Sequence, residues 1–275
     1  MPTFQDRGVT LRRLDYSETS QILVVFTQRY GKVRMIAKGI RRSTRKRFAT
    51  GIDLLEVGDV AFSVRTPGQE ALAILTAWRQ RSAFSGIRGA LPRIHAAEYA
   101  AEVVAALTED WDPHPQLFDT LVRFLEYLAG ADEVMAPVVR FQRRLLEAIG
   151  SIPRFDVCAA CGRPLEPHGP PYFSSREGGL LCPSCEASRA EKRQVRPDSL
   201  DILRSKETGT RNHPSEVSGG VQPRRPSRAP DARLNAMLGA FDIFNYHISH
   251  LMGRAPLLAA CLVDPRRART IVPPQ

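Results

Sequence analysis

Four cysteines are the residues whose spacing points most directly to chemistry. Cys158 and Cys161 form one Cys-x-x-Cys pair, Cys182 and Cys185 form a second, and the twenty residues 162–181 separate them. Zn²⁺ prefers four thiolate ligands in a tetrahedron, and a two-residue gap lets one tight turn aim two sulfurs at a single ion. Gly162 follows the first pair directly, where a tight turn favours glycine. We therefore expect these cysteines to hold one structural Zn²⁺ ion per chain.

Other uses of four thiols fit the sequence less well. An iron–sulfur cluster also takes four thiolates and stays open as an alternative. Disulfides are disfavoured because the N-terminus shows no secretory signal, and a catalytic zinc because it leaves one position open for water. His168, between the pairs, could replace a cysteine, but its proline- and glycine-rich neighbours favour a solvated turn. Residues 172–174 and 178–181 predict two short strands that bring the second pair back to the first.

A run of positive charge is the second candidate for chemistry. No acidic residue occurs between Glu18 and Asp53, yet nine basic residues fall within the nineteen positions 29–47. A surface with no balancing carboxylates suits the phosphates of a nucleic acid. Tyr30 and Phe48 bracket the run and either stack on bases or belong to the core. The expected phosphate-binding residues are Arg29, Lys32, Arg34, Lys38, Arg41, Arg42, Arg45, Lys46 and Arg47.

The composition agrees with an anionic partner. The chain of 275 residues carries a formal net charge of +10, and 43% of its residues are hydrophobic, so it can also bury a core. Nucleic acid is the first partner that such a charge favours, and an anionic membrane surface is the second. No apolar run is long enough to span a membrane. We expect a cytoplasmic, nucleoid-associated protein, in which the fifth cysteine, Cys261, is a buried apolar residue.

Motifs of catalysis are absent from the sequence. It has no phosphate-binding Gly-rich loop, no Gly-x-Ser-x-Gly elbow and no His-Glu-x-x-His. Asp15 and Glu18 leave a metal-dependent nuclease as an alternative, although residues 15–18 favour a turn. His247 and His250 lie three positions apart, where a core or surface role is favoured over a metal site. We predict that the protein is not an enzyme.

Hydrophobic periodicity predicts an α+β fold. Short apolar or alternating stretches at 9–14, 22–26, 33–37, 54–64 and 71–75 predict about five strands. A five-stranded barrel of the OB type, which binds oligonucleotides, fits this length and charge, and an SH3-like barrel is the alternative. We place this DNA-binding barrel at residues 1–80.

Helical periodicity follows the predicted barrel. Helices are expected over 94–107, 117–128 and 137–150, over 200–203 with Asp198 as the N-cap, and from 231 onward. The predicted helical domain covers 81–157, 191–204 and 231–263, and the zinc finger at 158–190 interrupts it. Residues 205–230 contain few large apolar side chains and are expected to be a disordered loop, and 264–275 a flexible tail.

Several of these stretches together resemble the RecO family of bacterial recombination mediators. No single stretch is specific by itself, but the order and spacing of the stretches along the chain are specific. The similarity covers nearly the full length of the chain and is carried by residues 14–20, 26–32, 37–42, 145–162, 172–174, 178–179 and 246–248.

The resemblance implies a mechanism and partners. It implies an OB-fold domain, a helical domain and a zinc finger, binding of single- and double-stranded DNA, and annealing of complementary strands without ATP. It also implies partnership with RecR and with the C-terminal tail of single-stranded DNA-binding protein, so that RecA loads on coated DNA. An acidic tail that ends in an aromatic residue needs an apolar pocket with a basic rim. Candidates for that rim are Arg123, Arg140, Arg143 and Arg144.

A different function class also fits the barrel and the cysteines. A zinc-ribbon protein that binds RNA or regulates transcription would carry the same features, and a preference for RNA over DNA would favour it.

Overall fold

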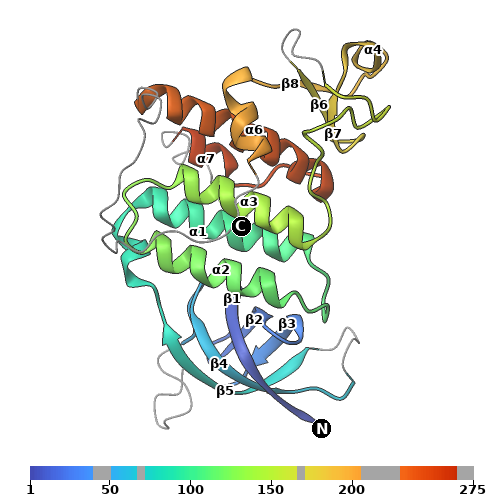
Figure 1. The fold of residues 1–275 in the computed structure, drawn as a ribbon. Coiled ribbons are helices and arrows are strands. Elements are labelled where there is room, and N and C mark those ends of the chain that lie inside the picture. Colours follow the sequence, from blue (N-terminus) through green and yellow to red (C-terminus); the bar gives the residue numbers. More distant parts are fainter. Residues whose placement is uncertain (40–50, 67–71, 166–170, 206–229, 265–275) are drawn as a thin grey trace, which may run out of the picture. The chain divides into compact units, whose positions relative to one another are not determined.

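The computed structural model describes residues 1–39, 51–66, 72–165, 171–205 and 230–264 (Figure 1). Five strands come first in the chain, and helices follow, with three short strands set among them. The chain divides into two compact units, one of Met1–Ile152 with Phe244–Gln275 and one of Pro153–Ile243. The predicted α+β class is confirmed, whereas the finer domain boundaries stay a prediction.

The first five strands close into a barrel in the order β1-β2-β3-β5-β4. β1 pairs with both β2 and β4, and β3 pairs in parallel with β5. This five-stranded barrel confirms the predicted OB fold, and the SH3-like alternative is not supported. The strands are β1 (Thr3–Ser17), β2 (Ser20–Thr27), β3 (Gly31–Ala37), β4 (Val57–Ser63) and β5 (Ala73–Ser82).

Four strands extend beyond their predicted bounds, β1 and β5 by the most. β1 continues through Asp15, which pairs with Gln21, so the predicted turn at 15–18 is wrong and the chain reverses only at Glu18 and Thr19. β5 continues to Ser82 through polar residues that alternate poorly in hydrophobicity. Pairing with neighbouring strands therefore outweighs the local apolar pattern at both places.

Apolar side chains fill the barrel, and aromatic rings pack at one end. Leu23 and Val25 of β2 are fully buried, as are inward-facing residues of β3. Phe4 stacks on Phe62 at a centroid distance of 5.4 Å, and Trp111 lies 6.0 Å from Phe62. Trp111 comes from the connection between the first two helices, so that connection completes the barrel core.

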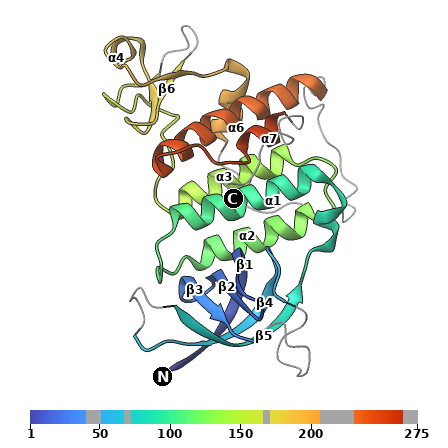
Figure 2. The same ribbon diagram turned by 180° about the vertical axis from the view of Figure 1, so that it is seen from behind.

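Helices α1 and α2 pack against the barrel in the same unit, and α3 packs against α2. Figures 1 and 2 both show α2 as the helix nearest to the barrel, and Phe118 of α2 lies 6.2 Å from Phe26 of β2 between ring centroids. No helix within the described ranges is long and apolar enough to cross a membrane. The larger elements are α1 (Leu91–Leu107), α2 (Pro115–Leu128), α3 (Met135–Ala148), α6 (Pro230–Met252) and α7 (Ala259–Val263), with a short 3₁₀ helix η1 (Ser85–Gly89) before α1.

A buried hydrogen-bond network joins three of these helices. Gln142 of α3 donates to the Tyr99 hydroxyl at 2.8 Å, and that hydroxyl lies 3.1 Å from Asn245 Oδ1 of α6. His247 is also buried, with Nε2 3.0 Å from the Ser151 carbonyl. Its contacts support the predicted core role, and Cys261 is buried as predicted.

The second unit holds a small three-stranded sheet in the order β7-β6-β8. The two strands predicted between the cysteine pairs are confirmed as β6 and β7. The predicted N-cap is wrong: Ser199 precedes α5, while Asp198 belongs to the 3₁₀ turn η2 and contacts Arg196 and Ser199. The elements are β6 (Tyr172–Ser174), β7 (Gly179–Leu181), α4 (Pro183–Glu186), β8 (Arg193–Gln194), η2 (Pro197–Ser199) and α5 (Leu200–Arg204).

Candidate functional site

The four cysteines lie together, as their spacing predicts. The sulfur atoms of Cys158, Cys161, Cys182 and Cys185 all fall within 4.8 Å of one another, and Cys161 Sγ is 3.7 Å from Cys182 Sγ. A tetrahedral zinc with Zn–S distances of about 2.3 Å places its sulfurs about 3.8 Å apart. Among the described residues, this is the one group of three or more His, Cys, Asp or Glu side chains that lie close enough together to hold a metal ion. The donor set therefore fits a closed structural zinc site.

Backbone hydrogen bonds shape the turn that carries each pair. Gly162 adopts a φ of +76° and donates its N–H to the Cys158 carbonyl at 2.8 Å, which confirms the tight turn predicted there. Cys185 donates to the Cys182 carbonyl at 3.0 Å, where α4 begins. The β6–β7 hairpin between the pairs returns the chain, so four thiols meet from two turns.

The thiols differ in their acidity. Burial opposes ionisation of Cys158, but backbone N–H groups of Cys182, Cys161 and Ala160 donate to its sulfur and lower its pKa to about 6. The neighbouring thiols of Cys182 and Cys161 raise the pKa of Cys185 to about 12. Four adjacent thiolates therefore need a cation to offset their repulsion.

A partly buried carboxylate orders the turn between the two strands that separate the cysteine pairs. Glu191 accepts hydrogen bonds from Ser174 Oγ at 2.6 Å and from the N–H groups of Ser175 and Arg176 at 3.1 Å each. These contacts fix the turn between β6 and β7. His168, the alternative ligand, lies outside the described residues.

Lys32, one of the nine predicted phosphate-binding residues, has several partners inside the protein. Its Nζ donates to the carbonyls of Ala105 at 2.7 Å and Thr108 at 2.6 Å, at the C-terminal end of α1, and lies 3.4 Å from Asp110. Only 13% of the side chain is exposed. Lys32 thus neutralises the negative end of a helix and joins α1 to the barrel.

The other described members of the basic run are more accessible. Arg29 pairs with Asp6 at 3.2 Å, and Arg34 pairs with Asp110 at 2.8 Å, yet 63% and 48% of these side chains are exposed. Lys38 is exposed at the end of β3. The remaining predicted residues, Arg41, Arg42, Arg45, Lys46 and Arg47, lie outside the described residues.

Tyr30, considered above as a stacking platform, belongs to the aromatic end of the barrel. Its ring lies 5.2 Å from Phe4 and 5.9 Å from Phe62 between centroids, in edge-to-face geometry. The core interpretation therefore holds for Tyr30, and Phe48 lies outside the described residues. Sequence reasoning missed Leu14 and Tyr16 of β1, which are 62% and 65% exposed.

The four predicted partner-binding arginines have unequal surroundings. Arg123 and Arg140 are exposed, and the Arg140 guanidinium lies 5.8 Å from the Tyr127 ring centroid. Arg143 is only 11% exposed and lies 5.4 Å from the Phe244 ring centroid, whereas Arg144 pairs with Glu147 at 3.0 Å. Arg123 and Arg140 are therefore the more accessible candidates, beside a half-exposed Tyr127.

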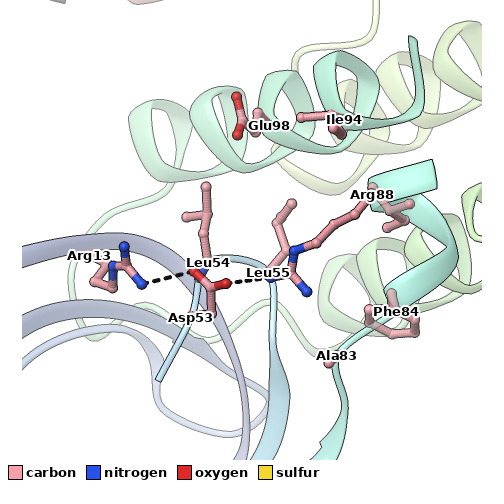
Figure 3. A pocket seen from close by; sticks show the side chains of 10 residues that line it. Arg13, Asp53, Leu54, Leu55, Ala83, Phe84, Arg88, Ile94 and Glu98 are labelled. Carbon is pink, nitrogen blue, oxygen red and sulfur yellow. Dashed lines mark hydrogen bonds and ion pairs between the residues drawn. The ribbon is translucent and has the colours of Figure 1, made fainter. Parts of the chain in front are cut away.

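A cavity of about 480 Å³ lies between the barrel and α1 (Figure 3). Asp53 accepts a hydrogen bond from Arg13 at 2.9 Å and another from Arg88, so this carboxylate is neutralised. Glu98, also at the cavity, has its pKa raised by burial. The remaining walls are largely apolar, from residues such as Leu54, Leu55, Phe84, Ile87 and Ile94.

The alternative nuclease site finds no support in the described residues. Asp15 Oδ1 accepts a hydrogen bond from Gln21 at 3.1 Å, and Glu18 is exposed in the hairpin turn. Neither belongs to a group of carboxylates close enough to share a metal ion within the described part of the chain. That the protein is not an enzyme stays a prediction.

Comparison with known proteins agrees with this architecture. Residues 1–80 match the family described as "Recombination protein O N terminal", and residues 88–214 match "Recombination protein O C terminal". A "DNA repair protein RecO" of Rhodopirellula baltica is 31% identical over 269 residues, which cover 94% of this chain and 98% of that protein. The chain belongs to the RecO family.

Further relatives extend this result. A "DNA repair protein RecO" of Anaeromyxobacter dehalogenans is 34% identical over 233 residues, or 84% of this chain and 90% of the relative. One of Myxococcus xanthus is 30% identical over 217 residues, or 77% and 84%. RecO membership supports a role in DNA repair and recombination and confirms the resemblance seen in the sequence.

Proposed function

We propose that this RecO protein binds single- and double-stranded DNA, anneals complementary strands without ATP, and with RecR helps RecA to load on DNA coated by single-stranded DNA-binding protein. The match of this chain to both RecO family regions supports the proposal. The N-terminal match ends at residue 80 and the C-terminal match begins at residue 88, and the closed barrel ends between them, at Ser82. The net charge of +10, and a basic run that has no acidic residue between Glu18 and Asp53, support a polyanionic partner.

The proposed mechanism is electrostatic. The basic run neutralises phosphates on two strands, which lowers their mutual repulsion and leaves base pairing to select the partner strand. Arg29, Arg34 and Lys38 are the accessible described members of this surface, and Arg41, Arg42, Arg45, Lys46 and Arg47 are its further proposed members. Lys32 acts within it chiefly by holding β3 against the end of α1.

The test mixes two labelled complementary oligonucleotides with the protein, without ATP or Mg²⁺. Energy transfer between the two labels then reports duplex formation. The proposal predicts faster duplex formation in the presence of the protein. The variant with Arg41, Arg42, Arg45, Lys46 and Arg47 all changed to alanine should be slower for every sequence. Binding without any acceleration would contradict the proposal and favour the RNA-binding alternative, which a competition between RNA and DNA then tests.

Salt dependence measures how many phosphates the surface contacts. If about five phosphates of a single strand are neutralised, the logarithm of affinity should fall with the logarithm of salt concentration with a slope of about −3.5. Titrations of an oligothymidine at several salt concentrations give this slope. A slope near zero would contradict an electrostatic interface.

We further propose that the cysteine cluster binds one structural zinc ion. The four sulfurs converge at distances that suit tetrahedral thiolate coordination. The ion would hold together two turns whose own sheet contributes only short strands.

The acidic tail of single-stranded DNA-binding protein is proposed to contact α2 and α3. Arg123 and Arg140 supply positive charge, and the half-exposed ring of Tyr127 supplies apolar area for a terminal aromatic residue. A labelled tail peptide should bind the native protein and bind the Arg123→Glu/Arg140→Glu variant at least tenfold more weakly. The control is Arg144→Ala, since Arg144 already pairs with Glu147. Equal loss in both variants would argue against this site.

A further inference from the structure

The cavity between the barrel and α1 takes its walls from separate parts of the first unit. Figure 3 shows Ile94 and Glu98 of α1 opposite Leu54 and Leu55, which precede β4. The volume of about 480 Å³ lies in the range of pockets that hold small organic molecules. None of the described residues proposed to contact DNA or the tail of single-stranded DNA-binding protein lines this cavity. It is therefore available for a separate ligand.

The charged groups at the cavity are unequally paired. Asp53 accepts hydrogen bonds from Arg13 and from Arg88, and a third from the backbone N–H of Leu54 at 2.8 Å. Glu98, by contrast, is partly buried, and no other described residue pairs with its carboxylate. Burial of a carboxylate without a partner is unfavourable and raises the pKa of Glu98. The charge at the cavity that lacks a partner is therefore negative.

The walls near this carboxylate are apolar, and part of their backbone is strained. Leu55, Phe84 and Ile87 are buried, and Ile94 is partly buried. Leu55 and Phe84 have φ angles of +65° and +43°, and they are two of the three non-glycine residues with positive φ in the described ranges. Strained backbone of this kind gathers at ligand-binding sites, where the surrounding structure maintains it. The cavity thus combines apolar walls with one unmatched negative charge.

We propose that this cavity binds a small organic cation, an amine or guanidinium compound with an apolar body. The apolar body replaces water along the walls, and the cationic group pairs with Glu98 through charge-assisted hydrogen bonds. An anion is disfavoured, because Glu98 repels it and the arginines at the cavity are already paired with Asp53. The site goes beyond the proposed function, since it recognises no nucleic acid.

Three probes with the same apolar body test the charge preference. Phenylbutylamine is cationic, phenylbutanol is neutral and phenylbutyrate is anionic. Isothermal titration calorimetry of the full-length protein measures their affinities. The native protein should bind the amine about tenfold more tightly than the alcohol, and should bind the carboxylate more weakly than either. Equal affinities for the amine and the alcohol would contradict the role of Glu98.

Two matched substitutions locate the charge that selects the amine. Glu98→Gln keeps the shape of the side chain and removes its charge, so the amine should lose its advantage of about tenfold while alcohol binding stays unchanged. Glu126→Gln is the control, because Glu126 is exposed on α2 and does not line the cavity. Equal loss in both variants would show that the amine responds to general surface charge and would overturn the proposal.

A third substitution tests the cavity itself. Ala83→Leu adds apolar volume at the wall and should weaken the binding of amine and alcohol alike, by about fivefold or more. Thermal unfolding shows whether each variant folds, and bound amine should raise the Tm of the native protein more than that of Ala83→Leu. An equal rise in both would place the amine elsewhere on the protein. If Ala83→Leu does not fold, the comparison of Glu98→Gln with Glu126→Gln still decides.

Competition separates this site from the proposed partner and DNA sites. The tail peptide of single-stranded DNA-binding protein and an oligothymidine should each leave the affinity for the amine unchanged. Displacement of the amine by the tail peptide would show that the cavity is a peptide site and would overturn the inference, as would no binding of any of the three probes. Strand annealing by the native protein tests the proposed function independently, so failure of one is distinguishable from failure of the other.

Discussion

At the scale of single residues, adjacent positions in one motif have separate roles. Gly31 turns the chain between β2 and β3 with a φ of +68°, and a β-carbon there would stand 2.1 Å from the Asp112 carbonyl oxygen. Lys32, the next residue, donates to the carbonyls at the end of α1. Both residues hold the α1–α2 connection against the barrel. The sequence motif that resembles RecO at this point thus includes a structural joint as well as Arg29, a proposed DNA contact.

The first prediction compares two glycines in left-handed conformations. Gly31→Ala should lower the free energy of unfolding by more than about 2 kcal/mol, because the added carbon collides with backbone as well as straining φ. Gly150→Ala, with a φ of +69° and open space around it, should lose only about 1 kcal/mol. Urea unfolding followed by circular dichroism measures both. Equal losses would show that the contact with Asp112 is unimportant.

The second prediction concerns the cysteines. Elemental analysis of the native protein should find one zinc per chain, and Cys182→Ser should lose most of it and become sensitive to proteolysis within 153–205. Cys261→Ser is the matched control, since this buried cysteine lies outside the cluster. Because neighbouring thiols raise the pKa of Cys185, metal binding must release protons, and zinc retention should fall as pH falls. Iron in place of zinc would support the cluster alternative.

At the scale of elements, the joint between β3 and α1 decides how the barrel meets the helices within its unit. Lys32 reaches the Ala105 carbonyl of α1 and two oxygens of the α1–α2 connection, on Thr108 and Asp110. Trp111 from the same connection packs into the aromatic end of the barrel. β3 also carries Arg34 and leads to Lys38 on its outer side. One strand therefore links the helical layer to the proposed DNA surface.

The third prediction separates these two roles with two lysines. Lys32→Ala should lower the free energy of unfolding by about 2 kcal/mol, because it removes charge-assisted hydrogen bonds from partly buried carbonyls. Lys38→Ala should leave stability unchanged and reduce the magnitude of the salt slope for single-stranded DNA by about 0.7. Thermal unfolding and salt titrations of both variants give the comparison. A Lys38→Ala protein with full salt dependence would remove Lys38 from the interface.

Elements set by local patterns were predictable from the sequence. The paired cysteines, the hairpin between them and the five strands follow from ligand spacing and alternation over a few residues. The structural role of Lys32 could not be predicted, because the carbonyls that accept its hydrogen bonds lie 73 and 76 positions away in the chain. The core role of Tyr30 was left open for the same reason, since Phe4 and Phe62 reach it only after the barrel closes. Contacts formed by closure leave no local signal.

At the scale of the whole molecule, a strongly basic chain combines a closed barrel, a helical layer and a cysteine finger. The sequence contains none of the three catalytic motifs considered above. It matches both the N-terminal and the C-terminal region of the RecO family. Annealing by charge neutralisation requires no nucleotide hydrolysis, and contact with a coating protein would let the reaction proceed on covered strands. We therefore propose that the protein acts on DNA that is already coated.

The most direct test is annealing of complementary labelled strands that are already coated with single-stranded DNA-binding protein, without ATP or Mg²⁺. The account predicts that the native protein accelerates duplex formation on coated and on bare strands, and that Arg123→Glu/Arg140→Glu retains only the acceleration on bare strands. Native protein that accelerates annealing on bare strands alone, or on neither substrate, would contradict the account.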